Sequence, residues 1–146
     1  MKFIRLSGSE LTERIYARDE HDVFERLKYL CPNEIIHETH YFAEERGTLA
    51  GVLSVQTNPY DSSVLWVKHV VVDPAFRQQG IATRLVQETF PQLEKDFPDI
   101  TTVELSTFTE EGRLHLRSMI AENAHLLGGL RMDYSPMDRD DDTYRP

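Results

Sequence analysis

One segment restricts the fold of this chain more than any other, because it joins a strand signal, a glycine and a helix signal without a break. Residues 64–72 are mostly apolar and β-branched, with turn-forming residues on either side, as is typical of a central strand buried on both faces. After a turn that contains Gly80, apolar residues recur near the helical period from residue 81 to residue 97. The sequence therefore predicts a strand, a turn and an amphipathic helix, and Pro91 predicts that this helix is kinked or split.

The rest of the chain supplies strand and helix signals in an order that predicts a layered fold. Gly47 separates two β-rich runs, which indicates an antiparallel hairpin. Ser9 and the acidic residues after it predict the start of a helical region that Pro32 ends. The predicted elements are strand 2–6, a helical region from 9 to 30, strands 39–44, 48–56 and 64–72, helix 81–97, strand 101–107, a helix from 109 to the glycines at 128 and 129, and strand 130–135.

This order of elements predicts an α/β or α+β fold in which helices cover the faces of one sheet. Acidic residues replace the apolar pattern after residue 136. We therefore expect one domain over residues 1–135 and an acidic mobile tail over residues 136–146.

Composition excludes several classes of function. The chain has 146 residues, a single cysteine (Cys31) and a formal net charge of -9. One cysteine excludes an internal disulfide and a thiolate metal cluster, and the acidic balance argues against nonspecific nucleic-acid binding, which needs a basic face. Charges interrupt the apolar runs soon after Met1, so neither a secretory leader nor a membrane span is predicted. We expect a cytoplasmic protein with no metal site, no nucleic-acid partner and no membrane partner.

The turn before the long helix has the features of an anion site. Backbone N–H groups at a helix start have no partner inside the helix and carry part of the positive end of the helix dipole, which suits a diphosphate. Gly80 allows the backbone to approach an anion closely, and Ala82 keeps the next inward position small. The Gly-Lys-Ser/Thr ending of a nucleoside-triphosphate loop and the Gly-x-Gly-x-x-Gly pattern of a dinucleotide fold are both absent.

The run from His69 to Ala82 resembles motif A of the Gcn5-related N-acetyltransferase (GNAT) family, and the order of the predicted elements is also similar. The resemblance implies a mixed, mostly antiparallel central sheet with helices on both faces, and transfer of an acetyl group from acetyl-CoA to an amine. It also implies that the amides of residues 78–83 bind the coenzyme A diphosphate, and that the strand edge at residues 70–72 pairs with the pantetheine arm. The implied coenzyme-binding residues are Val70, Val71, Val72, Arg77, Gln78, Gln79, Gly80, Ile81, Ala82 and Thr83.

The resemblance further implies where acetyl transfer takes place. In the family the central strand splays from its neighbour, here residues 101–107, and leaves a slot for the thioester. The amide of Val70 is then the donor that polarises the acetyl carbonyl. The general-base glutamate of many members falls on Trp66 in this sequence, and the next residue on that face is Lys68. Neither is a base.

Two other residues remain as candidate proton acceptors. His69 titrates in a suitable range, although strict strand alternation places it on the face opposite Trp66. Glu104 is expected to face the slot from the neighbouring strand, where it acts directly or through water. The family's thiolate-protonating tyrosine is missing near Gly128, and His125 and Tyr134 are the candidate replacements.

Two functions from different classes follow. The first is direct attack of a primary amine on acetyl-CoA in a ternary complex, with a low-pKa amine or a water-relayed base, because Trp66 replaces the expected carboxylate. The alternative is a catalytically degenerate coenzyme A-binding module that regulates a partner protein. The acceptor is a small molecule or a peptide or protein amine, and the chain is a monomer or a homodimer.

Overall fold

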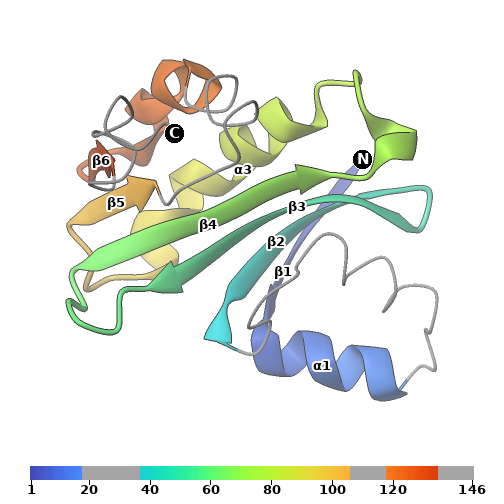
Figure 1. The fold of residues 1–146 in the computed structure, drawn as a ribbon, viewed down its shortest axis with the longest axis horizontal. Coiled ribbons are helices and arrows are strands. Elements are labelled where there is room, and N and C mark those ends of the chain that lie inside the picture. The colour runs from blue at the N-terminus through green and yellow to red at the C-terminus, as the bar shows by residue number, and fades with distance from the viewer. Residues whose placement is uncertain (18–36, 106–117, 135–146) are drawn as a thin grey trace, which may run out of the picture.

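The computed structural model describes residues 1–17, 37–105 and 118–134, and it contains a six-stranded sheet in the order β1-β2-β3-β4-β5-β6 (Figure 1). The strands are β1 Lys2–Ser7, β2 Thr39–Glu45, β3 Thr48–Thr57, β4 Val64–Val72, β5 Thr102–Leu105 and β6 Arg131–Tyr134. The helical elements are α1 Gly8–Ala17, η2 Pro74–Phe76, α3 Ile81–Asp96 and η3 Ala124–Leu127, and residues 118–122 are also helical. The helical region predicted beyond residue 17, the helix start at Thr109 and the tail at 136–146 lie outside the described residues.

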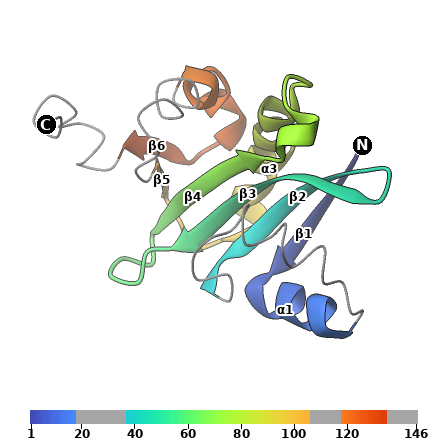
Figure 2. The ribbon, with the colours of Figure 1, turned by 45° about the vertical axis from the view of Figure 1, so that its right-hand side comes forward.

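The sheet is mixed, which confirms the predicted fold class. Antiparallel pairing joins β1 to β2, β2 to β3 and β3 to β4, whereas β4 pairs with β5, and β5 with β6, in parallel. Helix α3 packs against β3 and lies behind the sheet, while α1 packs against β1 and lies in front of it (Figure 2). In the part of the chain that the structure describes, no helix has the length and apolar character needed to cross a membrane.

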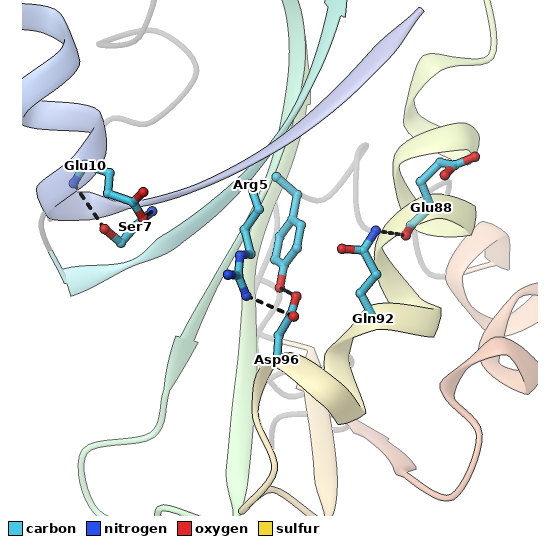
Figure 3. A network of polar contacts seen from close by, with 7 residues as sticks. Arg5, Ser7, Glu10, Glu88, Gln92 and Asp96 are labelled. Atoms are coloured by element: carbon cyan, nitrogen blue, oxygen red, sulfur yellow. Dashed lines mark hydrogen bonds and ion pairs between the residues drawn. The ribbon is translucent and has the colours of Figure 1, made fainter.

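Local sequence signals determine two of the connections between elements. The predicted hairpin turns at Arg46 and Gly47, which both have positive φ, 53° and 80°, as the favoured two-residue hairpin turn requires. Helix α1 begins at Gly8, one residue earlier than Ser9 predicts, because Ser7 and Glu10 form a reciprocal cap (Figure 3). Ser7 N donates to Glu10 Oε1 and Glu10 N donates to Ser7 Oγ, both at 3.1 Å. This is the capping box, and it holds the β1–α1 junction.

The main core lies between α3 and one face of the sheet, which we call the α3 face. In β4 the α3 face carries Leu65, Val67 and Val70, and the face that carries Trp66, the Trp66 face, is only partly buried. The prediction that β4 is buried on both faces is therefore wrong for the Trp66 face. The residues that make up the α3-face core include Tyr41, Leu53, Leu65, Val67, Val70, Ile81, Leu85, Val86, Phe90 and Leu93.

Helix α3 runs through Pro91 without a break, so the predicted split is wrong. Pro91 is exposed, and the residues just before and after it on the buried side, Phe90 and Leu93, are fully buried in the core. Gln92 Nε2 donates to Glu88 O at 2.8 Å beside the proline (Figure 3). Packing of the apolar stripe therefore outweighs the hydrogen bond that proline removes.

A partly buried polar contact joins the last turn of α3 to the sheet. Arg5 Nη1 lies 2.9 Å from Asp96 Oδ1 (Figure 3), and the Tyr41 hydroxyl donates to Asp96 Oδ2 at 2.8 Å. Burial of the phenol, together with the Asp96 carboxylate, raises the pKa of Tyr41 well above its ordinary value. The contact therefore joins β1, β2 and α3 through one carboxylate that is almost buried.

Replacing Tyr41 by Phe removes one charge-assisted hydrogen bond and keeps the ring in the core. We expect the free energy of unfolding to fall by about 1.5–3 kcal/mol, measured by urea denaturation. Tyr60→Phe is the control, because Tyr60 is 93% exposed, and its effect should stay within about 0.5 kcal/mol. Equal losses in the two variants would contradict a stabilising role for the Tyr41–Asp96 contact.

Candidate functional site

A β-bulge in the middle of β4 is the feature around which the candidate site is arranged. Ser54 of β3 pairs with His69, but its neighbour Val55 pairs with Val67, so Lys68 is an extra residue on β4. A bulge of this kind bends the strand and changes which face the following side chains occupy. Buried positions on the α3 face accordingly change from Leu65 and Val67 to Val70.

The bulge reverses one prediction about the site. Cross-strand partners share a face, and the β3 partners of Trp66 and His69 are Gln56 and Ser54, which lie two residues apart. His69 therefore lies on the same face as Trp66, and the placement expected from strict alternation is wrong. The physical reason is the extra residue, Lys68, between them.

The described part of the parallel pairing between β4 and β5 runs from Val64 opposite Thr102 to Val67 opposite Leu105. Leu105 is the last residue described before the gap at 106–117. On its other side, β4 pairs with β3 over residues 65–67 and again over residues 69–72. The bulge at Lys68 therefore separates two regular runs of β4, and Val70 lies in the second.

The loop after β4 exposes its backbone at the start of α3. Asp73 N donates to Ala50 O at 2.8 Å, and Asp73 Oδ1 accepts from Ala75 N at 2.9 Å, so the loop entrance is fixed. Residues 77–80 are exposed, and Arg77 Nε reaches back to Val72 O at 3.4 Å. Gln78 and Gly80 have φ values of 66° and 72°, whereas Gln79 between them does not have positive φ. Successive residues that alternate between positive and negative φ create concavities lined by backbone N–H groups.

Neither a capping side chain nor an acidic residue occupies the N–H groups at the start of α3. Gly80 is the N-cap residue and provides no side-chain cap, and the first turn carries no acidic residue. The N–H groups of Ile81, Ala82 and Thr83 have no acceptor inside the helix, because an α-helix leaves its first donors unpaired. A Cβ on Gly80 would meet no atom within 4 Å, so the space in front of this helix start is open.

Gly51 on β3 places the start of α3 close to the sheet. A Cβ on Gly51 would lie 3.1 Å from Val71 O, 3.2 Å from Ile81 Cγ2 and 3.3 Å from Leu85 Cδ1. The absence of a side chain therefore allows α3 to approach β3 directly behind the end of β4. Nothing in the sequence pattern marks Gly51 for this role, because the contact is between distant segments.

Two rows of polar side chains cross the Trp66 face. The first runs from Trp66 to Glu104 on β5 and Asp133 on β6, which are successive cross-strand partners. Lys68 Nζ lies 5.2 Å from the centre of the Trp66 ring, a cation–π distance. Sequence reasoning found Glu104, and it missed Asp133 because the parallel β5–β6 register brings the two together.

The second row consists of His40, Ser54 and His69 on β2, β3 and β4. His40 Nδ1 and Ser54 Oγ lie 2.7 Å apart, and both residues are fully buried. Burial, followed by the charges of His40 and Lys68, lowers the pKa of His69 from 6.5 to about 4. His69 is therefore neutral near pH 7. Sequence reasoning missed His40 and Ser54, whose relation to His69 depends on the β2–β3–β4 register.

The two candidates for thiolate protonation lie at different ends of the sheet. Tyr134 is opposite Leu105, at the carboxyl end of β5. His125 is exposed on η3, before β6, and Arg131 at the start of β6 donates its N–H to Thr101 O just before β5. The structure therefore places His125 toward the amino ends of β5 and β6 and does not bring it to the Val70 region.

Comparison with known proteins gives matches at three levels. Residues 7–119 match the model of the acetyltransferase (GNAT) family. An L-2,4-diaminobutyric acid acetyltransferase of Vibrio parahaemolyticus serotype O3:K6 is 32% identical over 77 residues, which cover 52% of this chain and 40% of that protein. The chain thus matches less than half the length of this curated relative.

Solved structures agree with this result. Escherichia coli ElaA superposes with a TM-score of 0.59 at 18% identity, over 80% of this chain and 84% of that one. A GNAT family acetyltransferase from Elizabethkingia anophelis with acetyl-CoA bound has a TM-score of 0.50 at 19% identity, over 63% of this chain and 62% of that one. These structures share the fold of the mixed sheet described above, and the family match extends over most of the chain. The chain belongs to the acetyltransferase (GNAT) family.

Proposed function

We propose that this chain transfers an acetyl group from acetyl-CoA to a primary amine by direct attack in a ternary complex. The observation that carries the proposal is the end of β4. There the bulge and the uncapped start of α3 occur within one continuous segment. A thioester linked to a diphosphate needs an extended strand for its arm and unpaired N–H groups for its phosphates, and we propose that this segment supplies both.

The loop and the first turn of α3 are the proposed diphosphate site. A Cβ on Gly80 would meet no atom within 4 Å, and the positive end of the α3 dipole favours an anion there, where we propose that the amides of Gln78 to Thr83 bind it. Each hydrogen bond to a charged oxygen contributes about 1.5–3 kcal/mol. Val70, Val71 and Val72 then pair with the pantetheine arm along the strand edge.

The acetyl carbonyl is proposed to lie against the amide of Val70. The amine attacks the thioester carbon, negative charge develops on the carbonyl oxygen, and the Val70 N–H stabilises this charge. The C–S bond then breaks and coenzyme A leaves as a thiolate, for which Tyr134 is the remaining candidate proton donor. We do not propose His125 as this proton donor, because it lies toward the amino ends of β5 and β6.

The acceptor is proposed to be a small cationic amine that approaches over the Trp66 face. Glu104 and Asp133 follow Trp66 in one row, so carboxylates are present to attract an ammonium group. The net charge of -9 also attracts a cationic acceptor at long range. The diaminobutyrate named for the Vibrio relative is an amine of this class, and Glu104 remains a candidate base, directly or through water.

A second candidate is a coenzyme A-binding module that has lost catalysis and regulates a partner protein. Trp66 at the position of the usual glutamate favours it. This candidate predicts tight acetyl-CoA binding and no acetylated product from any amine, whereas the first predicts turnover. Mass spectrometry of products from an amine library, after thermal-shift titration with acetyl-CoA, separates the two.

Gly80→Val should weaken acetyl-CoA binding at least about tenfold, or roughly 1.4 kcal/mol, because the side chain fills the space in front of the helix start. Calorimetric titration measures the change in Kd. Gly47→Val is the matched control, since Gly47 also has positive φ, 80°, and open space around it. The two variants share the cost of backbone strain. If Gly47→Val lost binding to the same degree, the loop would not be the diphosphate site.

Initial rates measured against both substrates should give intersecting lines in double-reciprocal plots, because both must be bound before the amine attacks. Parallel lines would instead indicate an acetylated protein intermediate. Electrospray mass spectrometry of the protein after incubation with acetyl-CoA alone provides a second measurement. We expect no mass increase of one acetyl group.

A further inference from the structure

An arginine in the first turn of α3 has its charged end against an aromatic ring of β1. Arg84 Cζ lies 5.3 Å from the centre of the Phe3 ring, a cation–π distance. The N-terminal end of β1 lies near the start of α3 in both views of the molecule (Figure 1 and Figure 2). Arg84 is exposed, whereas Phe3 is partly buried against the core. The ring therefore restricts the position of a guanidinium group that remains open to solvent.

Arg84 follows Gly80 by one helical turn. Arg84 N donates to Gly80 O at 3.0 Å, the bond that joins residues four apart in an α-helix. Side chains of a helix lean toward its N-terminus, so the Arg84 side chain leans toward the turn that contains Gly80. A Cβ on Gly80 would meet no atom within 4 Å. The start of α3 thus offers a basic side chain, as well as N–H groups, beside the proposed diphosphate site.

A row of four cross-strand partners extends under this first turn from the end of β4 to β1. Phe3 pairs with Ala43, Ala43 with Gly51 and Gly51 with Val72. The two middle residues are small, and the first turn of α3 lies against Gly51. Neighbouring strands are about 4.8 Å apart, so Phe3 and Val72 are separated by about 14 Å. A ligand with its arm on β4 and its diphosphate at the helix start can therefore place a further group on the β1 side of α3.

The charge of Arg84 is not neutralised by a neighbouring side chain. Among the described residues, no carboxylate lies within ion-pair distance of Arg84. Arg5, in contrast, lies 2.9 Å from Asp96. Glu88, one turn further along α3, is exposed and makes no ion pair with Arg84. A guanidinium presents its N–H donors in a fork that matches a phosphate, so Arg84 is able to bind one without losing another partner.

We propose that Arg84 binds the phosphate on the ribose 3′ carbon of coenzyme A and makes the protein selective for this coenzyme over its dephosphorylated form. This inference rests on the proposed function. Along the coenzyme, the ribose phosphate follows the diphosphate, as Arg84 follows the proposed diphosphate site in the fold. As a phosphate monoester it carries a charge of about -1.5 to -2 near pH 7. The Arg84 guanidinium neutralises part of this charge.

Phe3 is the positioning residue in this proposal. An arginine side chain has many rotamers in solution, and ordering them opposes binding. Contact with the ring restricts these rotamers before the coenzyme arrives. A carboxylate in the place of Phe3 would also hold the guanidinium, but the phosphate would then have to displace it. The ring has no net charge, so it holds the cation without neutralising it.

Calorimetric titration with acetyl-CoA and with acetyl-dephospho-CoA, which lacks only the 3′ phosphate, tests the assignment. Wild type should bind acetyl-CoA at least about tenfold more tightly than acetyl-dephospho-CoA. Arg84→Gln should lose affinity for acetyl-CoA and keep its affinity for acetyl-dephospho-CoA, so that the two Kd values agree within about twofold. Equal losses for both ligands would mean that Arg84 acts on the diphosphate or through overall charge, and the assignment would be refuted.

Arg131→Gln is the matched control, because it removes one exposed arginine from β6. The ratio of the two Kd values should remain that of the wild type. Phe3→Leu keeps an apolar side chain against the core and removes the ring, so its ratio should lie between those of wild type and Arg84→Gln. A wild-type ratio in Phe3→Leu would show that the ring does not position Arg84.

The same titrations separate failure of this assignment from failure of the proposed function. Loss of folded protein lowers the number of binding sites in a titration and leaves the ratio of the two Kd values unchanged. If wild type binds both ligands equally well and acetylates an amine, the assignment of Arg84 is refuted and the proposed function stands. If wild type binds neither ligand, both proposals fail.

Discussion

The extra residue in β4 is the constraint on which the remaining arrangement depends. Lys68 shifts the β3 register by one residue, so the α3 face changes from Val67 to Val70 and the Trp66 face gains His69. A bulge leaves its extra residue outside the regular ladder, and the ammonium of Lys68 lies over the Trp66 ring, a contact that contributes about 0.5–1 kcal/mol at exposed sites. One local irregularity thus decides both the shape of the strand edge and the chemistry beside it.

Local signals were enough to predict the order of the elements and the bounds of β4. A β-branched apolar run, a glycine turn and a helical stripe each carry their own periodicity, and none depends on a distant partner. The exposed loop at residues 77–80 could be predicted for the same reason. The bulge could not be predicted, because β-branched and basic residues flank Lys68 and no glycine or turn residue marks the shift. Its position follows from which β3 residue pairs with which β4 residue.

Tertiary packing also explains one local rule that failed and one contact that the sequence did not signal. Pro91 was expected to kink or split α3, but the buried stripe on both sides of it holds one continuous helix against the sheet. Gly51 carried no signal of its own, yet a methyl group there would crowd Val71 O and the first turn of α3. The helix start is therefore placed by a contact between β3 and α3, whereas its anion-binding character comes from the local sequence around Gly80.

Charge is distributed unevenly over the Trp66 face. The carboxylates of Glu104 and Asp133 follow Trp66 in one row, on the β5 side, and His69 belongs to the row on the β3 side. In the reaction that we propose, an amine acceptor arrives as a cation, and carboxylates attract that form. On the other side of the bulge, the charge of Lys68 adds to burial in holding His69 unprotonated. Because Lys68 also lies over the Trp66 ring, one side chain couples the two rows, so a change at Lys68 should alter the electrostatics of both.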